Sequence, residues 1–162
     1  MNGRELRGSI NEHRLRLQSE HGLAPYTWLQ PHYNLVEREG YERDYAPITG
    51  LSVAPYYALA SGFLAGKYRS ANDLAGTARQ PGASHYLQTP AGPSVLAALD
   101  SVSAERGVEQ ATVALAWLRA RPGVVAPLAS ARTVQQLPAL LASVQLDLTA
   151  DEVEALDKAS AA

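Results

Sequence analysis

Three β-prone runs alternate with helix-prone segments along this 162-residue chain, and the alternation limits its fold more than any other feature. The runs are residues 25–31, 51–57 and 124–128. The third, Val-Val-Ala-Pro-Leu, is wholly apolar, which predicts burial on both faces, as in a parallel sheet. Strands that alternate with helices favour right-handed β-α-β units around such a sheet. We therefore predict an α/β fold. Its three strands are few for this class and indicate part of something larger.

Apolar periodicity and end signals predict the helices. We expect helices over 95–106 before Gly107, over 113–118 before Pro122-Gly123, and over 133–146, with Leu137, Leu140, Leu141 and Val144 on one side. Thr149-Ala-Asp-Glu152 is a capping box that opens a last helix. Residues 11–21 and 37–45 are compatible with short helices. Residues 60–93 are rich in small and turn-forming residues, and we expect a long loop there.

Composition excludes several classes of function. The net charge of −2 comes from interspersed charges, so no basic stripe indicates a nucleic-acid partner. The absence of cysteine excludes disulfides and cysteine-based chemistry. The longest apolar stretches, such as 111–118, are far shorter than the ~20 residues that span a bilayer, and the polar N-terminus does not have the pattern of a signal peptide. We expect a cytoplasmic protein with no membrane partner.

Four motifs in a fixed order resemble those of one enzyme family. They are Leu-Gln-Pro-His-Tyr-Asn-Leu-Val-Glu-Arg-Glu at 29–39, Ala-Pro-Tyr-Tyr-Ala-Leu-Ala-Ser-Gly-Phe-Leu-Ala-Gly-Lys-Tyr-Arg at 54–69, Val-Ala-Leu-Ala-Trp-Leu at 113–118, and Pro-Leu-Ala-Ser-Ala-Arg-Thr-Val-Gln-Gln-Leu at 127–137. Together they resemble the aldo-keto reductases of the bacterial and potassium-channel-β-like branch. That family folds as a TIM (β/α)8 barrel with its active site at the carboxyl ends of the strands.

The resemblance implies which part of a barrel this chain forms. Residues 22–162 resemble the C-terminal half of the barrel, approximately strands 6 to 8 with their helices, whereas residues 1–21 match poorly. A partial barrel leaves strand edges exposed, and such edges pair with other chains. We therefore expect that the chain self-associates, binds a partner that supplies the N-terminal half of the barrel, or is unstable alone.

The resemblance also implies NADP as cofactor, with the nicotinamide near the first two strands. Gln30 resembles the residue that hydrogen-bonds the nicotinamide amide. Tyr56 resembles the aromatic residue on which the nicotinamide ring stacks; the alternative is an aromatic that closes a barrel core. The positions beside the pyrophosphate are Tyr57, Ala58, Leu59, Gly62 and Lys67. Glycine permits close backbone approach, and Lys67 is either a phosphate contact or an ordinary surface lysine.

The adenosine end of the cofactor falls on the fourth motif, residues 127–137. Ser130 and Arg132 resemble the residues that hold the 2′-phosphate, which favours NADP over NAD, and Gln136 resembles an adenine contact. Two further contacts of the family pattern, an acid and an asparagine, are replaced by Ala139 and Leu140. This departure predicts weaker recognition of the adenine.

The family protonates the carbonyl oxygen with a tyrosine tuned by lysine, aspartate and histidine, and the resemblance places none of the four in this chain. We therefore expect no catalytic and no metal-binding residue here. His32 is expected to be a packing or surface residue, and His85 a surface residue. The implied function is NADP-dependent reduction of aldehydes or ketones, conditional on a partner that supplies the tetrad. The alternatives are a non-catalytic NADP- or protein-binding module and a decayed gene fragment.

Overall fold

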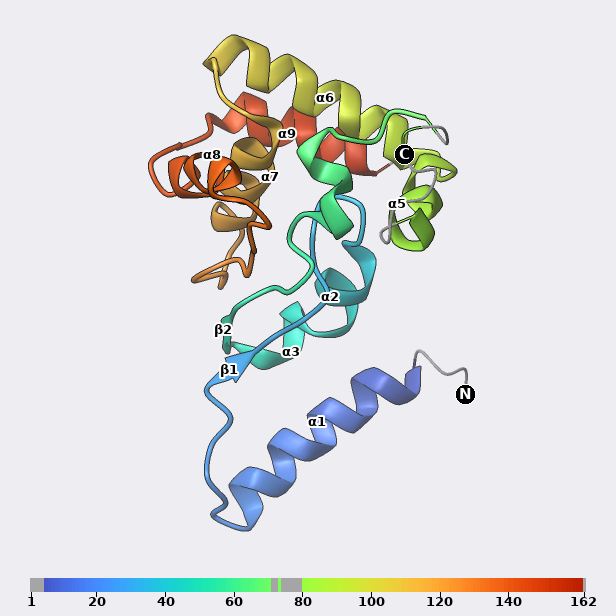
Figure 1. Ribbon diagram of the computed structural model, residues 1–162. Coiled ribbons are helices and arrows are strands. Elements are labelled where there is room, and N and C mark those ends of the chain that lie inside the picture. The colour runs from blue at the N-terminus through green and yellow to red at the C-terminus, as the bar shows by residue number, and fades with distance from the viewer. Residues whose placement is uncertain (1–4, 71–72, 74–79, 162) are drawn as a thin grey trace.

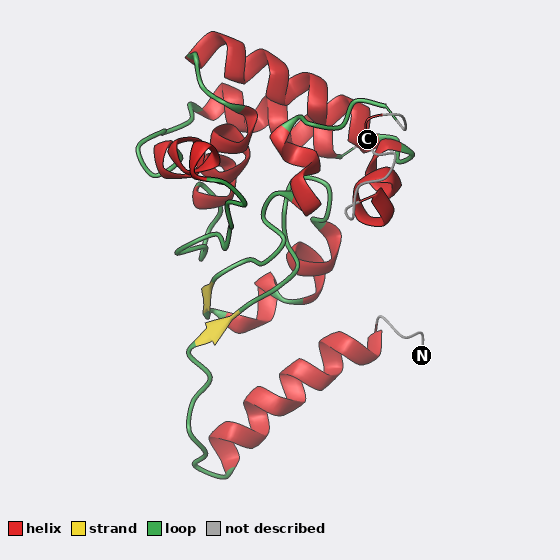
Figure 2. Ribbon diagram, viewed as in Figure 1, coloured by secondary structure: helices red, strands yellow, loops and turns green. Residues whose placement is uncertain are grey.

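A computed structural model describes residues 5–70, 73 and 80–161. A helical lobe lies beside a small parallel sheet (Figure 1; Figure 2). Strands β1 (Trp28–Leu29) and β2 (Ser52–Val53) pair in parallel, with Trp28 opposite Ser52. The pairing continues beyond the strands, because the N–H of Tyr56 donates to the carbonyl of Pro31 at 3.0 Å. The predicted parallel arrangement of the first two runs is therefore confirmed.

The third β-prone run lies along the other edge of β2. The N–H of Val125 donates to the carbonyl of Val53 at 2.9 Å, and that of Leu128 donates to the carbonyl of Pro55 at 2.8 Å. Only Val53 and Val124 form a bridge pair, so residues 124–128 are not a full strand in the described structure. The prolines at 55 and 127 have no N–H to donate, which explains why the pairing is short.

The prediction that residues 124–128 are buried on both faces is wrong. Val124 packs against the core with Leu29 and Val53, whereas Val125 is 54% and Leu128 44% exposed. Side chains alternate across a strand, so Val125 points to the opposite face from Val124, as Trp28 does from Leu29. Within the described residues the helices cover one face of the sheet, and the other face stays open.

The helices occupy most of the chain. They are α1 (Glu5–Glu20), α2 (Glu39–Asp44), α3 (Ala46–Thr49), α5 (Gln80–Leu87), α6 (Ala91–Arg106), α7 (Gln110–Arg119), α8 (Leu137–Ala142) and α9 (Ala150–Ser160), with 3-10 turns η1 (Ala60–Ala65) and η2 (Val134–Gln136). The expected loop over 60–93 is therefore wrong in part, because η1, α5 and the start of α6 lie in it. Residues 71–72 and 74–79 of that loop lie outside the described residues.

Helix α7 forms the centre of the core. Its residues from Gln110 to Leu118 are all buried, and α6 packs against both α7 and α9. The apolar positions predicted for α6 are confirmed: Val95, Leu96, Leu99 and Val102 are buried. The capping box is also confirmed, since the N–H of Thr149 donates to Glu152 Oε2 at 2.7 Å and the N–H of Glu152 donates to Thr149 Oγ1 at 3.3 Å.

Helix α8 differs from its prediction. The helix expected over 133–146 is a 3-10 turn followed by six α-helical residues. Of the predicted apolar side only Leu140 packs against the core, whereas Leu137, Leu141 and Val144 are 43%, 66% and 63% exposed. Nothing in the described structure covers that side of the helix.

Helix α1 is joined to β1 by an extended connection (Figure 1), and its Arg14 and Leu15 line a small hollow with Trp28, Leu29 and Tyr45. It is longer than the helix expected over 11–21, and it ends before Gly22, whose φ of +60° stops the helix as predicted. Neither α1 nor any other helix in the described residues is long and apolar enough to cross a membrane.

Candidate cofactor site

The segments predicted to bind the cofactor follow the ends of the three parallel segments. Gln30 follows β1, Tyr56 follows β2, and Ser130 follows residues 124–128. Because the segments run parallel, their carboxyl ends meet at one edge of the sheet, where active sites of α/β barrels lie. The fold thus brings three distant parts of the sequence together.

Two adjacent hollows lie at this edge, and Tyr56 lines both. The first, which we call the Ser130 hollow, has a volume of about 620 Å³ and is lined by Tyr56, Tyr57, Ala58, Leu59, Ser61, Gly62, Gly82, Leu128, Ala129 and Ser130. The second, the Gln30 hollow, has a volume of about 430 Å³ and includes Gln30, His32 and Tyr56 beside α2. Both volumes lie in the usual range of small-molecule sites. Seven of the ten predicted residues therefore line these hollows.

Three aromatic rings meet where the hollows join. His32 stacks on Tyr56 with ring centroids 5.3 Å apart and an angle of 30° between the planes. Tyr57 stands edge-on to Tyr56 at 5.4 Å and tilted to His32 at 5.2 Å. His32 is thus a packing residue, one of the two roles expected for it. Tyr56 nevertheless remains 41% exposed, so it has room for a planar ring on the side that His32 leaves open.

The loop after Tyr56 has a strained backbone. Tyr57, Ala60 and Ser61 have φ values of +56°, +47° and +58°, although none of them is glycine. Each such residue costs roughly 1–2 kcal/mol. Clusters of strained residues occur at ligand-binding and active sites, where the surrounding structure maintains them. Here the buried Phe63 and Leu64 anchor the loop to the core.

Asn34 is a site residue that sequence reasoning did not single out. It is fully buried, and its Nδ2 donates to the carbonyl of the strained Tyr57 at 2.9 Å. Its Oδ1 accepts from the N–H of Val36, also at 2.9 Å. The residue stands in the motif over 29–39, but nothing in the sequence distinguishes a buried asparagine from one on the surface.

The residues predicted for the phosphates and the adenosine lie less close together. Lys67 is exposed, lines neither hollow and forms no ion pair within the described residues. Arg132 is exposed, and its guanidinium likewise has no partner in that part of the chain. The Oε1 of Gln136 accepts from the N–H of Arg132 at 2.9 Å, so that the glutamine closes the turn before η2. Of the adenosine-end residues, only Ser130 lines a hollow.

Proton transfer needs a group at the mouth of the hollows, and the two tyrosines with strongly raised pKa values lie elsewhere. Burial, with a hydrogen bond to Glu42, raises the pKa of Tyr33, whose hydroxyl donates to Glu42 Oε1 at 2.7 Å. Burial and the neighbouring Glu37 raise the pKa of Tyr86. Both side chains belong to the core. The described residues also contain no cluster of three histidine or acidic side chains that could hold a metal.

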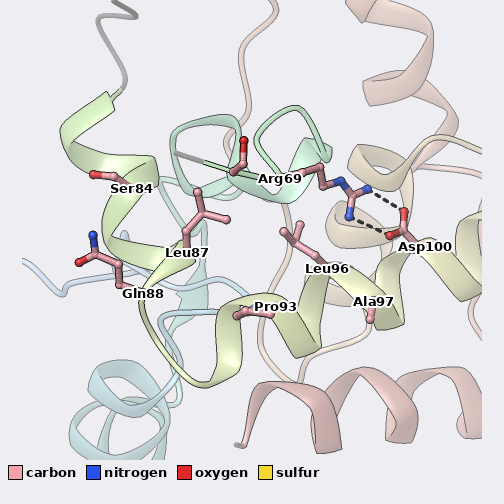
Figure 3. A pocket seen from close by; sticks show the side chains of 9 residues that line it. Arg69, Ser84, Leu87, Gln88, Pro93, Leu96, Ala97 and Asp100 are labelled. Atoms are coloured by element: carbon pink, nitrogen blue, oxygen red, sulfur yellow. Dashed lines mark hydrogen bonds and ion pairs between the residues drawn. The ribbon is translucent and has the colours of Figure 1, made fainter. Parts of the chain in front are cut away.

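A further pocket of about 490 Å³ lies between α5 and α6, away from every predicted site residue. Figure 3 shows Arg69 on one side of it, with two hydrogen bonds to Asp100 on the other. Both bonds are 2.7 Å long, and Gln110 donates to the same carboxylate. Asp100 thus neutralises the arginine, and the pair joins the end of the strained loop to α6. We assign this pocket a structural role.

Comparison with known proteins decides the family. The model of the aldo/keto reductase family matches residues 9–161, nearly the whole chain. The chain belongs to the aldo/keto reductase family. Members of this family fold as TIM barrels and generally use NADP(H), and the parallel sheet with its helices is consistent with part of such a barrel.

Individual relatives agree with this assignment. The chain is 32% identical over 142 residues to an aldo-keto reductase of Fusarium vanettenii, an alignment that covers 85% of the chain and 37% of the relative. It is 33% identical over 143 residues to an uncharacterized oxidoreductase of Mycobacterium tuberculosis, covering 82% and 42%. It is 26% identical over 144 residues to a probable aryl-alcohol dehydrogenase of Saccharomyces cerevisiae, covering 86% and 44%. The chain therefore spans less than half the length of these relatives.

Proposed function

We propose that this chain forms strands 6 to 8 of an aldo-keto reductase barrel and supplies the cofactor-binding side of an NADP-dependent carbonyl reductase. The observation that carries the proposal is the position of Tyr56. It lines two hollows at the carboxyl ends of three parallel segments, with one ring face packed on His32 and 41% of the residue exposed.

The residues present fit part of NADP well. The exposed side of Tyr56 and the neighbouring Gln30 suit a nicotinamide ring with its amide. The glycine at 62 and the left-handed loop permit close backbone approach to a pyrophosphate, and Arg132 has a free guanidinium for a 2′-phosphate. The adenine side fits less well, because Gln136 already closes its own turn and Ala139 and Leu140 offer no polar side chain.

When bound, NADPH supplies the hydride of carbonyl reduction. This chain's residues would hold the nicotinamide in place and exclude water from one side of it. The reaction also needs a proton donor within hydrogen-bond reach of the carbonyl oxygen. In our proposal that donor, with its lysine, aspartate and histidine, comes from strands 1 to 5, supplied either by a longer form of the chain or by another polypeptide.

A non-catalytic NADP-binding module is the second candidate. One observation favours it: apart from the two tyrosines, none of the described residues that line the Ser130 hollow has a side chain that ionises. Such a surface binds and orients a ligand but offers little acid–base chemistry.

Titration of the 162-residue chain with NADPH, followed by cofactor fluorescence, tests the binding. We expect Tyr56→Ala to weaken NADPH binding about three- to tenfold, the worth of one aromatic contact. We expect Arg132→Ala to reduce the preference for NADPH over NADH about tenfold or more, because a charge-assisted pair is lost. Absence of NADPH binding by the unaltered chain would contradict the proposal.

The reductase and the module are then separated by carbonyl-dependent oxidation of NADPH. We expect no rate above background from the chain alone, and a measurable rate when a polypeptide carrying strands 1 to 5 is added. If binding is present and the added polypeptide produces no rate, the module is the better description. A rate from the chain alone would contradict the assignment of the proton donor to strands 1 to 5.

A further inference from the structure

Asn34 connects the two loops that form the site. It lies five residues beyond the end of β1, is fully buried, and donates from Nδ2 to the carbonyl of Tyr57 in the loop beyond β2. Its Oδ1 accepts from Val36, and its backbone exchanges hydrogen bonds with Glu37 at 3.1 and 3.4 Å. The asparagine is thus held rigidly in its own turn while it reaches across to the neighbouring loop.

The carbonyl that accepts from Asn34 belongs to Tyr57, whose backbone is strained. Tyr57 has a φ of +56°, a conformation that residues other than glycine, asparagine and aspartate rarely adopt. Its carbonyl accepts both from Asn34 Nδ2 at 2.9 Å and from the N–H of Ala60 at 2.8 Å. Because both bonds depend on the present direction of this carbonyl, they favour the left-handed conformation over the alternatives.

This conformation decides which side of Tyr56 is free. With its backbone held, Tyr57 places its ring edge-on to Tyr56, at 63° and 5.4 Å, while His32 covers one face of Tyr56. Rotation of Tyr57 into an extended conformation would carry its ring away from this position. We propose that Asn34 is a positioning residue: it locks Tyr57 in the left-handed conformation and thereby holds Tyr56 with one side open for the nicotinamide ring. This inference rests on the proposed function.

A comparison of two ligands separates positioning from general stability. NADPH contains the nicotinamide ring, whereas 2′-phospho-ADP-ribose carries the same phosphates and adenosine without it. For Asn34→Asp, which keeps an acceptor for Val36 and loses the donor to Tyr57, we expect the preference for NADPH over 2′-phospho-ADP-ribose to fall about three- to tenfold. Asn34→Ala serves as the second variant if the buried carboxylate prevents folding.

Thr112→Val is the matched control. Thr112 is also buried and also donates to a backbone carbonyl, that of Ala139, at 2.7 Å, but it lies in α7 outside both hollows. We expect it to lower stability while leaving the ratio of the two dissociation constants unchanged. An equal fall in the ratio for Thr112→Val and Asn34→Asp, or no fall for Asn34→Asp or Asn34→Ala, would overturn the positioning role.

A second measurement needs no cofactor. Glycine adopts a φ of +56° without strain, so Tyr57→Gly should keep this conformation without help from Asn34. We expect Asn34→Asp to raise the unfolding equilibrium constant about three- to tenfold in the natural chain, where relaxation of Tyr57 recovers part of the loss, and by a larger factor in Tyr57→Gly, which has no strain to recover. If Asn34→Asp changes the unfolding equilibrium constant by the same factor in both backgrounds, the proposal that Asn34 maintains the conformation of Tyr57 is overturned.

The two levels of failure are distinguishable. If the unaltered chain binds neither ligand, the proposed function fails and the positioning role fails with it, while the two-background comparison still reports whether Asn34 holds Tyr57. If the chain binds both ligands equally well, only the claim about the nicotinamide ring and Tyr56 is overturned.

Discussion

Gly66 ends the strained loop in a place where only glycine fits. Its φ is +70°, and a Cβ there would overlap Gln110 Oε1 and lie 2.7 Å from Gln110 Cδ. Gln110 is buried and already donates to Asp100, so it has little freedom to move. The glycine thus allows the loop to approach α7 closely, which connects the cofactor loop to the core.

We expect Gly66→Ala to lower the free energy of unfolding by about 2–4 kcal/mol, from backbone strain together with overpacking. Gly107→Ala is the control, because Gly107 has a similar φ of +64° with nothing within 4 Å of the added Cβ, and it should cost only about 1 kcal/mol. Urea denaturation of both variants measures the difference. Similar costs would show that the approach to Gln110 is not tight in solution.

Glu152 makes the free energy of unfolding depend on pH in the acidic range. Its carboxylate pairs with Arg106 and caps α9, and these hydrogen bonds lower its pKa from 4.5 to about 2. A pKa lowered by folding contributes stability above the unfolded value, and that stability is lost as the pH falls from 4.5 towards 2. We expect Glu152→Gln to lower the free energy of unfolding by about 1–2 kcal/mol at pH 7. We also expect it to flatten the pH dependence of this free energy between pH 4.5 and 2.

Thermal melts from pH 7 down to pH 2 measure this effect. Asp151→Asn is the control on the same turn, since Asp151 is exposed and the capping box does not use its side chain. A Glu152→Gln variant that loses stability between pH 4.5 and 2 as steeply as the unaltered protein would contradict the assignment.

At the scale of elements, Asp157 fastens the last helix to the rest of the molecule. It accepts from Trp117 Nε1 of α7 at 2.9 Å, from Arg121 at 2.9 Å and from Arg38 at 3.1 Å. The two guanidinium groups also lie over the ring of Trp117, at 4.6 and 5.3 Å. One carboxylate in α9 therefore pairs with two arginines from distant parts of the chain, around a buried tryptophan, and Arg38 is paired with Glu42 as well.

We expect Asp157→Ala to cost about 2–3 kcal/mol of unfolding free energy, because it leaves the partly buried Arg121 and an indole N–H without their acceptor, whereas Arg38 keeps its pair with Glu42. Glu154→Ala is the control in the same helix: its ion pair with Lys158 is exposed and should contribute under about 0.5 kcal/mol. Chemical denaturation compares the two. Equal costs would mean that the Asp157 cluster adds no more than a surface pair.

At the scale of the whole molecule, the open face of the sheet is the main feature without a partner. Trp28 and Val125 point to this face and are 57% and 54% exposed. The outer edge of β1 has no neighbouring strand in the described residues. Apolar surface and free strand edges of this kind favour association with other chains.

We therefore expect the 162-residue chain to associate at micromolar concentration, and Trp28→Glu to shift it towards the monomer. Leu23→Glu is the control, since Leu23 is equally exposed, at 59%, but lies in the connection before β1. Light scattering coupled to size-exclusion chromatography measures the mass. A wild-type chain that stays monomeric and unfolds cooperatively would contradict this expectation.

Local signals in the sequence were sufficient for part of this structure. The capping box at Thr149, the apolar face of α6 and the parallel order of the three β-prone segments are confirmed, because each depends on residues a few positions apart or on general rules of connection. The family followed from motifs that are contiguous in sequence and was confirmed by comparison. Those motifs also named seven residues that line the hollows.

What only the tertiary structure decided depends on which distant residues meet. The apolar sequence of residues 124–128 does not show whether both faces of the run are covered by other residues. In the same way, the pattern predicted an apolar side for α8, and most of that side is exposed. Asn34 and Tyr57 are 23 positions apart, and Asp157 lies far from Arg38, so no local pattern reveals these contacts. The sequence by itself determined which elements form and which family they belong to. Burial and the long-range hydrogen bonds, which exist only after folding, decided which faces are open and how Tyr56 is held.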